Sequence, residues 1–226
     1  MPCQLKEVNV HIRSRNEDEK HERREAILDA AEEAFIEQRF DKTSMDAIAR
    51  SAGLSRALLY VYFRDKEDIH VGLSVRAANT LYDLMHKYVS ECDKGVQQMY
   101  AIGKAYLYFY RHQQDYFRIL TLSAGMRPSG KKLHENSTHA EKAYAEADNR
   151  ILQLMVSSVK KALADGSLIL PNEITPVSIA FYMRGSLHGV IMLQDGNSEL
   201  FKTNEVDTDQ WLEQSLSLLA RGLSGE

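Results

Sequence analysis

The chain has 226 residues, of which 44% are hydrophobic and 27% are charged, and its formal net charge is −4. This composition excludes a disordered chain or a fibre and allows a substantial core in one or two domains. The negative charge also argues against a protein that coats nucleic acid through a broad basic surface, so any contact with DNA has to be local.

Export, membrane insertion and metal binding have no signature in the sequence. The start of the chain lacks an apolar core of signal-peptide length, and no run of about 18 apolar residues occurs. Cys3 and Cys92 are the only cysteines and stand in no metal-ligand spacing, while His134 and His139 are spaced so that they do not share a helical face. We therefore expect a cytoplasmic protein without membrane contact, metal or cofactor.

The N-terminal part is predicted to be an arm followed by a helix. Residues 1–15 show no periodicity, and a solvated tail is favoured over an arm that holds its arginines near DNA. A helix is expected from Asn16 or Asp18 to about Arg39. Its inner face is an apolar stripe of Ile27, Ala31, Ala34 and Phe35.

Two short helices joined by a glycine turn are predicted next. Thr43 and Ser44 offer side-chain oxygens for the start of a helix that runs to about Ala52. Gly53 follows, where a left-handed residue without a Cβ readily ends a helix. Ser55 then caps the second helix.

The outer face of this second helix is polar and cationic. The basic residues between Ala47 and Arg64 are Arg50, Arg56 and Arg64 itself, and no acidic residue lies in that interval. A local cationic face on a helix-turn-helix indicates contact with DNA. The outward residues are Arg56, Ala57, Tyr60 and Tyr62, with Lys66 at the start of the next helix.

This segment resembles the DNA-binding domain of the TetR family of bacterial regulators, in which an IA..AG(V/L)S....Y.YF..K pattern crosses the helix-turn-helix. The resemblance covers about Arg23 to Val75 by motif and the remainder by architecture. It implies an all-α fold with an N-terminal three-helix helix-turn-helix domain, a long fourth helix, and a helical domain for effector binding and dimerisation. The pattern is met by Ile48, Ala49, Ala52, Gly53, Leu54, Ser55, Tyr60, Tyr62, Phe63 and Lys66.

The resemblance also implies which side chains contact double-stranded operator DNA. Arg56 has a side chain that is long enough to contact a guanine and a guanidinium that can donate two hydrogen bonds to it. A homodimer is expected to place the helix from Arg56 to Tyr62 of each copy in a major groove of a near-palindromic operator. The family positions that mostly hold phosphates are occupied by Ser44, Tyr60, Tyr62 and Lys66, and Thr43, Ser55 and Ala57 complete the expected DNA-binding set.

A long helix at 66–90, capped by Asp65 and Asp68, is predicted to join two domains. The DNA-binding domain is expected at 16–90, and the effector-binding and dimerisation domain at 91–226. No strand pattern appears. Further helices are expected at 96–112, 115–124, 133–163, 176–194 and 207–223, with a loop at 195–197.

Tyrosines concentrate in the second domain. Core packing explains most of them, but converging hydroxyls can line a pocket for a ligand with apolar and polar parts. For a single tyrosine, a core or surface position is favoured over ligand contact, and a structural role is likewise favoured for His188. By resemblance, a small amphipathic or partly aromatic effector is expected to bind here and to lower operator affinity by changing the tilt of the helix at 66–90. The expected lining is Tyr106, Tyr110, Phe117, Tyr182 and His188.

The last two helices are expected to carry a homodimer interface. Gly185 and Gly189 lie one turn apart and permit close helix approach. By resemblance, two helices from each of two chains form a four-helix interface, although burial within one chain explains the leucines of the last helix nearly as well. These leucines form one stripe of Leu212, Leu216, Leu219 and Leu223.

Catalysis has no signature in the sequence. There is no glycine-rich phosphate loop, and Gly185–Gly189, Gly-Ser-Leu-His-Gly, has the wrong spacing for a nucleophile elbow. We therefore expect no catalytic residue and no enzyme. The expected function is a ligand-responsive DNA-binding regulator, usually a repressor, and the alternative is a non-inducible or architectural DNA-binding protein of the same fold. The sequence identifies neither the operator sequence nor the effector.

Overall fold

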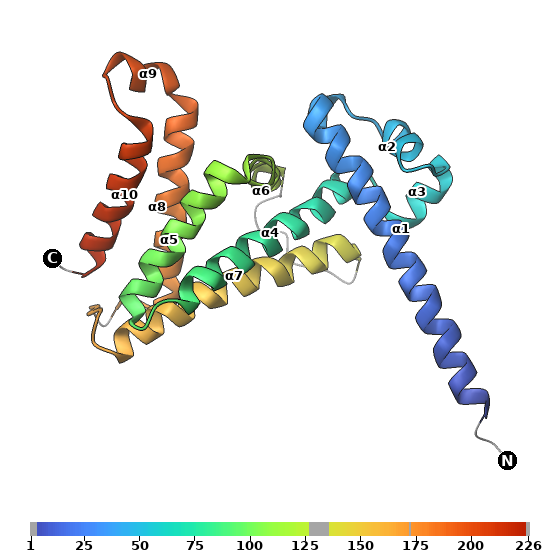
Figure 1. Cartoon of the computed structure of the whole chain (residues 1–226), viewed down its shortest axis with the longest axis horizontal. Helices are drawn as coiled ribbons and strands as arrows, with labels where there is room; N and C mark the ends of the chain where they lie inside the picture. The colour runs from blue at the N-terminus through green and yellow to red at the C-terminus, as the bar shows by residue number, and fades with distance from the viewer. Residues whose placement is uncertain (1–3, 127–135, 172, 225–226) are drawn as a thin grey trace. The chain divides into compact units, whose positions relative to one another are not determined.

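The computed structural model describes residues 4–126, 136–171 and 173–224, and every regular element in these ranges is a helix (Figure 1). The predicted all-α class is confirmed. None of the helices in these ranges combines the length and the apolar character that crossing a membrane requires. The helices are α1 (Gln4–Lys42), α2 (Met45–Ser51), α3 (Arg56–Tyr62), α4 (Lys66–Ser90), α5 (Gly95–His112), α6 (Gln114–Met126), α7 (His139–Ala164), α8 (Pro176–Gly196), α9 (Ser198–Thr203) and α10 (Thr208–Ser224).

The helices divide into two compact units. α4, α6 and α7 each contribute residues to both units. The predicted domains divide the chain after residue 90, whereas residues of α4 from Ala77 onward belong to the second unit. The first unit comprises Met1–Arg76 and Thr121–Tyr144, and the second comprises Ala77–Leu120 and Ala145–Glu226.

α1 begins earlier than the sequence predicts. The prediction placed an arm at 1–15, whereas the structure is helical from Gln4 onward, and residues 1–3 lie outside the described ranges. No glycine or proline occurs from Gln4 to Lys42, so nothing in the sequence stops the upstream extension of a helix that has already formed. Near the other end of α1, Arg39 has a φ of 65° and interrupts the helical conformation.

α1 is held in the first unit by an apolar stripe and by ion pairs. The predicted inner stripe of Ile27, Ala31, Ala34 and Phe35 is buried. On another side of α1, a single arginine of α4, Arg76, gathers several carboxylates, and such charge-assisted contacts are stronger than neutral ones. Its guanidinium lies 2.6 Å from Glu25, 2.8 Å from Asp29 and 3.0 Å from Glu32.

Close helix contacts build the second unit. Gly95 of α5 lies against Ala162 of α7, where a Cβ on the glycine would come within 2.0 Å of the Ala162 nitrogen. Gly103 of α5 lies against Leu216 of α10, where a Cβ would come within 2.3 Å of the leucine Cδ1. Leu212 and Leu216 are buried, so the first half of the predicted leucine stripe packs within the chain.

Two helix boundaries of the second half differ from the prediction. α8 reaches Gly196 and α9 follows at Ser198, so the predicted loop at 195–197 shortens to a single residue between helices. α9 was not predicted, because six residues carry too little periodicity. Phe201 of α9 packs edge-on against Trp211 of α10, with ring centroids 4.8 Å apart, and this contact stabilises the short helix.

The start of α7 is set by a capping box. The hydroxyl of Thr138 accepts from the backbone N–H of Glu141 at 3.1 Å, and the Glu141 carboxylate accepts from the backbone N–H of Thr138 at 2.8 Å. The helix therefore begins at His139, later than predicted. The predicted helical residues 133–135 lie outside the described ranges.

Candidate nucleic-acid interface and effector site

The helix-turn-helix has the local structure that the sequence predicts. Ser44 Oγ accepts from the backbone N–H of Ala47 at 3.2 Å, and Ser55 Oγ accepts from that of Leu58 at 3.2 Å. Gly53 has a φ of 67°, the left-handed conformation that ends α2. Both predicted caps and the glycine turn are confirmed.

α3 is anchored by buried side chains and by α1. Leu59 and Phe63 are 0% and 1% exposed. Arg24 of α1 donates from Nη1 to the carbonyl oxygen of Tyr62 at 3.0 Å, and its guanidinium carbon lies 4.0 Å from the centroid of the Phe63 ring. Burial lowers the pKa of Arg24 and the nearby Asp68 carboxylate opposes that effect, so Arg24 stays charged. The last turn of α3 is therefore fixed to α1.

Six of the eight predicted DNA-contact residues lie on the outer side of α2 and α3. Val61, which the prediction omitted, is 75% exposed on the same helix. The exposed positions 56, 57, 60 and 61 of α3 share one face at helical spacing, a signal that could have identified Val61. An apolar side chain there can contact a thymine methyl group. The six residues are Ser44, Ser55, Arg56, Ala57 and Tyr60, which are exposed, and Tyr62, which is half-buried.

Thr43 and Lys66, by contrast, bind backbone carbonyls inside the first unit. Thr43 is 3% exposed, and its hydroxyl is directed to the carbonyl oxygens of Ala34 and Arg39 at 3.1 and 3.0 Å. The Thr43 side chain thus holds the end of α1, and the predicted DNA contact of this residue stays a prediction. Lys66 Nζ donates to the carbonyl oxygens of Phe40 and Thr43 at 2.8 and 3.0 Å and lies over the Phe40 ring. Two of the three donors of Lys66 thus hold the turn between α1 and α2.

Arg56 is oriented by a neighbouring acid. Asp46 of α2 accepts from Arg56 Nη1 at 3.0 Å, and the Tyr60 hydroxyl lies 3.5 Å from Arg56 Nη2. The hydrogen bond with Tyr60, followed by the charge of Asp46, raises the pKa of Arg56 above its ordinary value. The acid-free interval of the sequence begins one residue after Asp46, so this ion pair was not predicted. The Arg56 side chain nevertheless remains 61% exposed and open to a base edge.

Four of the five predicted effector residues meet in the second unit. Phe117 of α6 lies between α5 and α8, with its ring centroid 5.0 Å from that of Tyr110 and 5.9 Å from that of Tyr106. The Phe117 centroid is also 5.9 Å from that of His188. Tyr182 stays apart from this aromatic cluster and is 51% exposed on α8.

Side-chain hydrogen bonds connect the aromatic cluster. The Tyr106 hydroxyl lies 2.8 Å from His188 Nδ1, and the Tyr110 hydroxyl donates to Asp195 Oδ1 at 2.5 Å. Gln194 Nε2 donates to the Tyr110 oxygen at 3.4 Å, while Gln194 Oε1 is buried without a hydrogen-bond partner among the described residues. Asp195 was predicted in a loop and was therefore missed. Among the residues that the structure describes, no group of three or more histidine, cysteine or carboxylate side chains is arranged to hold a metal ion.

Burial keeps the aromatic cluster neutral. Burial lowers the pKa of His188, and the charge of Arg184 lowers it further, so the imidazole is neutral at pH 7. Burial and the hydrogen bond to Asp195 raise the pKa of Tyr110, so its hydroxyl keeps its proton. Arg184 itself pairs with Asp148 of α7 at 2.8 Å. The cluster offers neutral donors and acceptors between rings, as sites for amphipathic molecules do.

α8 exposes an apolar face that includes its two glycines. A Cβ on Gly185 or Gly189 would meet no atom within 4 Å, so the helix backbone is open to close approach there. The side chains exposed on the same face are large and apolar. Its large side chains are Val177, Phe181, Tyr182, Met192 and Leu193.

Comparison with known proteins relates the helix-turn-helix to one family. Residues 27–71 match the family model described as bacterial regulatory proteins, tetR family. FasR, an HTH-type transcriptional activator of Mycolicibacterium smegmatis, is 27% identical over 44% of this chain and 45% of its own length. TtgR, an HTH-type transcriptional regulator of Pseudomonas putida, is 23% identical over 91% of this chain and 95% of its own length. The chain thus spans less than half of FasR and most of TtgR.

The fold of most of the chain also has solved counterparts. FadR of Thermus thermophilus, described as a TetR-family transcriptional repressor in complex with lauroyl-CoA, has a TM-score of 0.62 and is 18% identical. The match covers 88% of this chain and 94% of that one. At this identity the likeness shows a shared fold, which confirms the predicted architecture of a helix-turn-helix domain followed by a helical domain.

Proposed function

Since this chain carries the DNA-binding domain of the TetR family of bacterial regulators, we propose that it regulates transcription by binding operator DNA as a homodimer and by releasing it when a small amphipathic molecule binds. Repression is the proposed mode, as in the T. thermophilus FadR. FasR, named an activator, is the contrasting case.

The observation that carries the proposal is the anchored, outward face of α3. Arg56 is exposed and oriented by Asp46, while Leu59 and Phe63 keep the opposite side of the helix in the core. In the proposed complex, Arg56 reads a guanine and Val61 contacts an apolar base edge. The phosphate contacts come from Ser44, Ser55, Tyr60 and Tyr62, with the remaining donor of Lys66.

The exposed face of α8 is the proposed dimer interface. Gly185 and Gly189 allow another helix to approach, and the apolar side chains on either side of them supply area to bury. The predicted leucine stripe contributes less to this interface than expected, because Leu212 and Leu216 are buried within the chain and Leu223 packs against the cluster around Val159. Two-fold symmetry of the protein then requires a near-palindromic operator.

The aromatic cluster of Tyr106, Tyr110, Phe117 and His188 is the proposed effector site. Its neutral hydroxyls, imidazole and the buried Gln194 oxygen suit a ligand with an apolar body and one hydrogen-bonding end. An acyl chain with a polar head fits that description, and the FadR structure was solved with lauroyl-CoA.

Release of DNA follows from connectivity. α4 contributes residues to both units, so a ligand that favours one position of α4 also biases α3. Only a difference in affinity between the two states can shift the equilibrium. A coupling of about 1 to 3 kcal/mol gives about 5- to 150-fold release.

The alternative is a non-inducible DNA-binding protein of the same fold. It is favoured by the contacts that the rings of the cluster already make with one another, since a ligand has to displace some of them. The two readings differ in whether any bound molecule changes operator affinity.

Selection of duplexes from a random pool by the purified chain, followed by footprinting, tests the proposal. We expect an enriched near-palindrome with two half-sites about one helical turn apart, protected by a dimer. Lauroyl-CoA and a neutral aromatic amphiphile serve as the first effector probes. A protected single half-site bound by a monomer contradicts the dimer, and probes that bind without changing operator affinity favour the alternative.

A further inference from the structure

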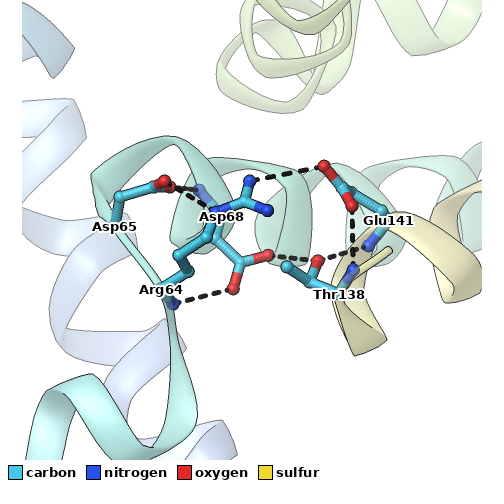
Figure 2. Close-up of polar contacts among 5 residues, drawn as sticks. All are labelled: Arg64, Asp65, Asp68, Thr138 and Glu141. Carbon is cyan, nitrogen blue, oxygen red and sulfur yellow. Dashed lines mark hydrogen bonds and ion pairs between the residues drawn. The ribbon is translucent and has the colours of Figure 1, made fainter. Parts of the chain in front are cut away.

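The starts of α4 and α7 are joined by a closed ring of side chains within the first unit (Figure 2). Asp68 of α4 is 3% exposed and accepts two hydrogen bonds, from the backbone N–H of Arg64 at 3.0 Å and from the Thr138 hydroxyl at 2.5 Å. Glu141 of α7 closes the ring. It accepts from Arg64 Nη2 at 3.4 Å and from the backbone N–H of Thr138 at 2.8 Å.

The ring lies where the two helices are capped. Asp65 accepts from the backbone N–H of Asp68 at 2.7 Å at the start of α4, and Thr138 accepts from that of Glu141 at the start of α7. The first N–H groups of a helix have no partner within the helix, so these acceptors are needed where the chain enters it. One helix start therefore cannot move against the other without the loss of the hydrogen bond from Thr138 to the buried Asp68 carboxylate and of the contact between Arg64 and Glu141.

The ring holds the segment that follows α3. Arg64 stands two residues after Tyr62, the last residue of α3, and Asp68 holds its backbone N–H. Between them, Phe63 is buried in the core. The position of the end of α3 thus depends on Asp68, and through the Thr138 hydroxyl it depends on α7.

α7 itself belongs to both units. Its residues up to Tyr144 belong to the first unit, and its later residues to the second. There, Val159 and Ala162 form a buried cluster with Ile179 of α8. A helix is a rigid element that can carry a displacement along its length.

We propose that Thr138 and Glu141 are positioning residues of the DNA-binding domain, which set α3 through Asp68 and Arg64 and pass displacements of α7 to it. The first turn of α7 then provides a connection to α3 that runs through Asp68 at the start of α4 and through Arg64. The consequence at DNA rests on the proposed function, whereas the coupling of α7 to α3 does not.

Hydrogen exchange of the full chain tests the coupling without DNA. Thr138→Val removes the hydroxyl that Asp68 accepts, and Glu141→Gln weakens the contact with Arg64 while it keeps an acceptor for the cap. We expect the protection of amides 59–64 to fall about tenfold in Thr138→Val, the factor that about 1.4 kcal/mol represents, and less in Glu141→Gln. Amides of α10 keep their protection.

Two variants serve as controls. Thr138→Ser keeps the hydroxyl, and Glu146→Gln removes an exposed acid elsewhere on α7. Both should leave the 59–64 amides unchanged. Unchanged protection there in Thr138→Val overturns the proposal. If Thr138→Val loses protection throughout the chain, Glu141→Gln becomes the test. Equal protection of the 59–64 amides in Glu141→Gln and the wild type then overturns the proposal.

A duplex selected by the wild-type chain provides the readout at DNA. Thr138→Val should weaken binding to this duplex about tenfold more than it weakens binding to a scrambled duplex. Thr138→Ser should discriminate between the two duplexes as the wild type does. Equal weakening of both duplexes contradicts a positioning role. If the wild type selects no duplex, the proposed function fails, and the exchange experiment still decides the coupling.

Discussion

In the helix-turn-helix unit, Arg24 and Lys66 donate to backbone carbonyls of other helices and turns, whereas the hydrogen bonds of the aromatic cluster join one side chain to another. Arg24 holds the carbonyl of Tyr62, and Lys66 holds those of Phe40 and Thr43. A carbonyl that belongs to a packed backbone cannot turn away from its donor without moving the chain. The end of α3 and the turn between α1 and α2 are therefore each held in one geometry.

The aromatic cluster allows exchange of partners. Tyr106 pairs with His188, and Tyr110 pairs with Asp195 on the exposed end of α8. Each of these groups can rotate about its own side-chain bonds and offer the same atoms to a ligand. Under the proposed function, one chain then combines a DNA-binding face held in one geometry with an effector site whose contacts a ligand can replace.

The largest expected effect is a loss of folding stability at low pH, through a buried histidine of the first unit. His70 of α4 is 1% exposed and packs near the rings of Phe35 and Phe40, and its burial lowers its pKa to about 4. The unfolded chain, with a histidine pKa of about 6.5, binds the proton that the folded chain excludes. The contribution of neutral His70 to the free energy of unfolding is therefore complete above pH 6.5, and it falls by about 3 kcal/mol as the pH drops to 4.

Urea denaturation at pH 7 and pH 4 measures this loss. His70→Gln should remove the corresponding part of the pH dependence, whatever its stability at pH 7. His188→Gln, at a half-buried histidine of the aromatic cluster, should remove less. Parallel pH profiles for the wild type and His70→Gln contradict the assignment.

Removal of an anchor of α3 is expected to have the next largest effect. Arg24→Met keeps a long side chain over Phe63 but loses the bond to the Tyr62 carbonyl, so the free energy of unfolding should fall by about 1.5 to 3 kcal/mol. Arg23→Met, at the exposed neighbouring arginine, should change it by less than about 0.5 kcal/mol. Equal values for the two variants in urea denaturation refute the anchoring role.

A smaller effect is expected in the aromatic cluster. Tyr106→Phe removes one side-chain hydrogen bond to His188, and the expected loss is about 0.5 to 1.5 kcal/mol. Nuclear magnetic resonance titration of the His188 ring should register the change in its partner. Tyr108→Phe, at a tyrosine that is 42% exposed on the same helix, is the matched control. The two variants should differ, and identical His188 titrations argue against the pair.

What the sequence predicts here is local. Ser44, Gly53 and Ser55 act within three or four residues of themselves, so their residue types alone determine the caps and the turn. The resemblance to the family pattern predicts the architecture as well. The concentration of tyrosines on α5 indicated residues that the structure brings together in the aromatic cluster.

Pairs between distant helices were not predictable in the same way. Asp46 and Arg56 meet across a turn, and Asp68 and Thr138 meet over 70 residues, with no periodicity that relates them. The burial of Thr43 had the same cause, since its hydroxyl bonds to α1 carbonyls that only the folded chain brings near. Long-range partners depend on packing, which spacing along one chain does not record.

Titration of a selected duplex with the wild type and Arg56→Ala tests the central claim most directly. Arg118→Ala is the matched control, because Arg118 is an exposed arginine of α6 that also pairs with an aspartate. The account predicts that Arg56→Ala weakens binding about tenfold or more and relaxes the preference at one base position of each half-site, while Arg118→Ala binds like the wild type. Equal binding by all three proteins, or an Arg56→Ala variant that keeps every base preference, would contradict it.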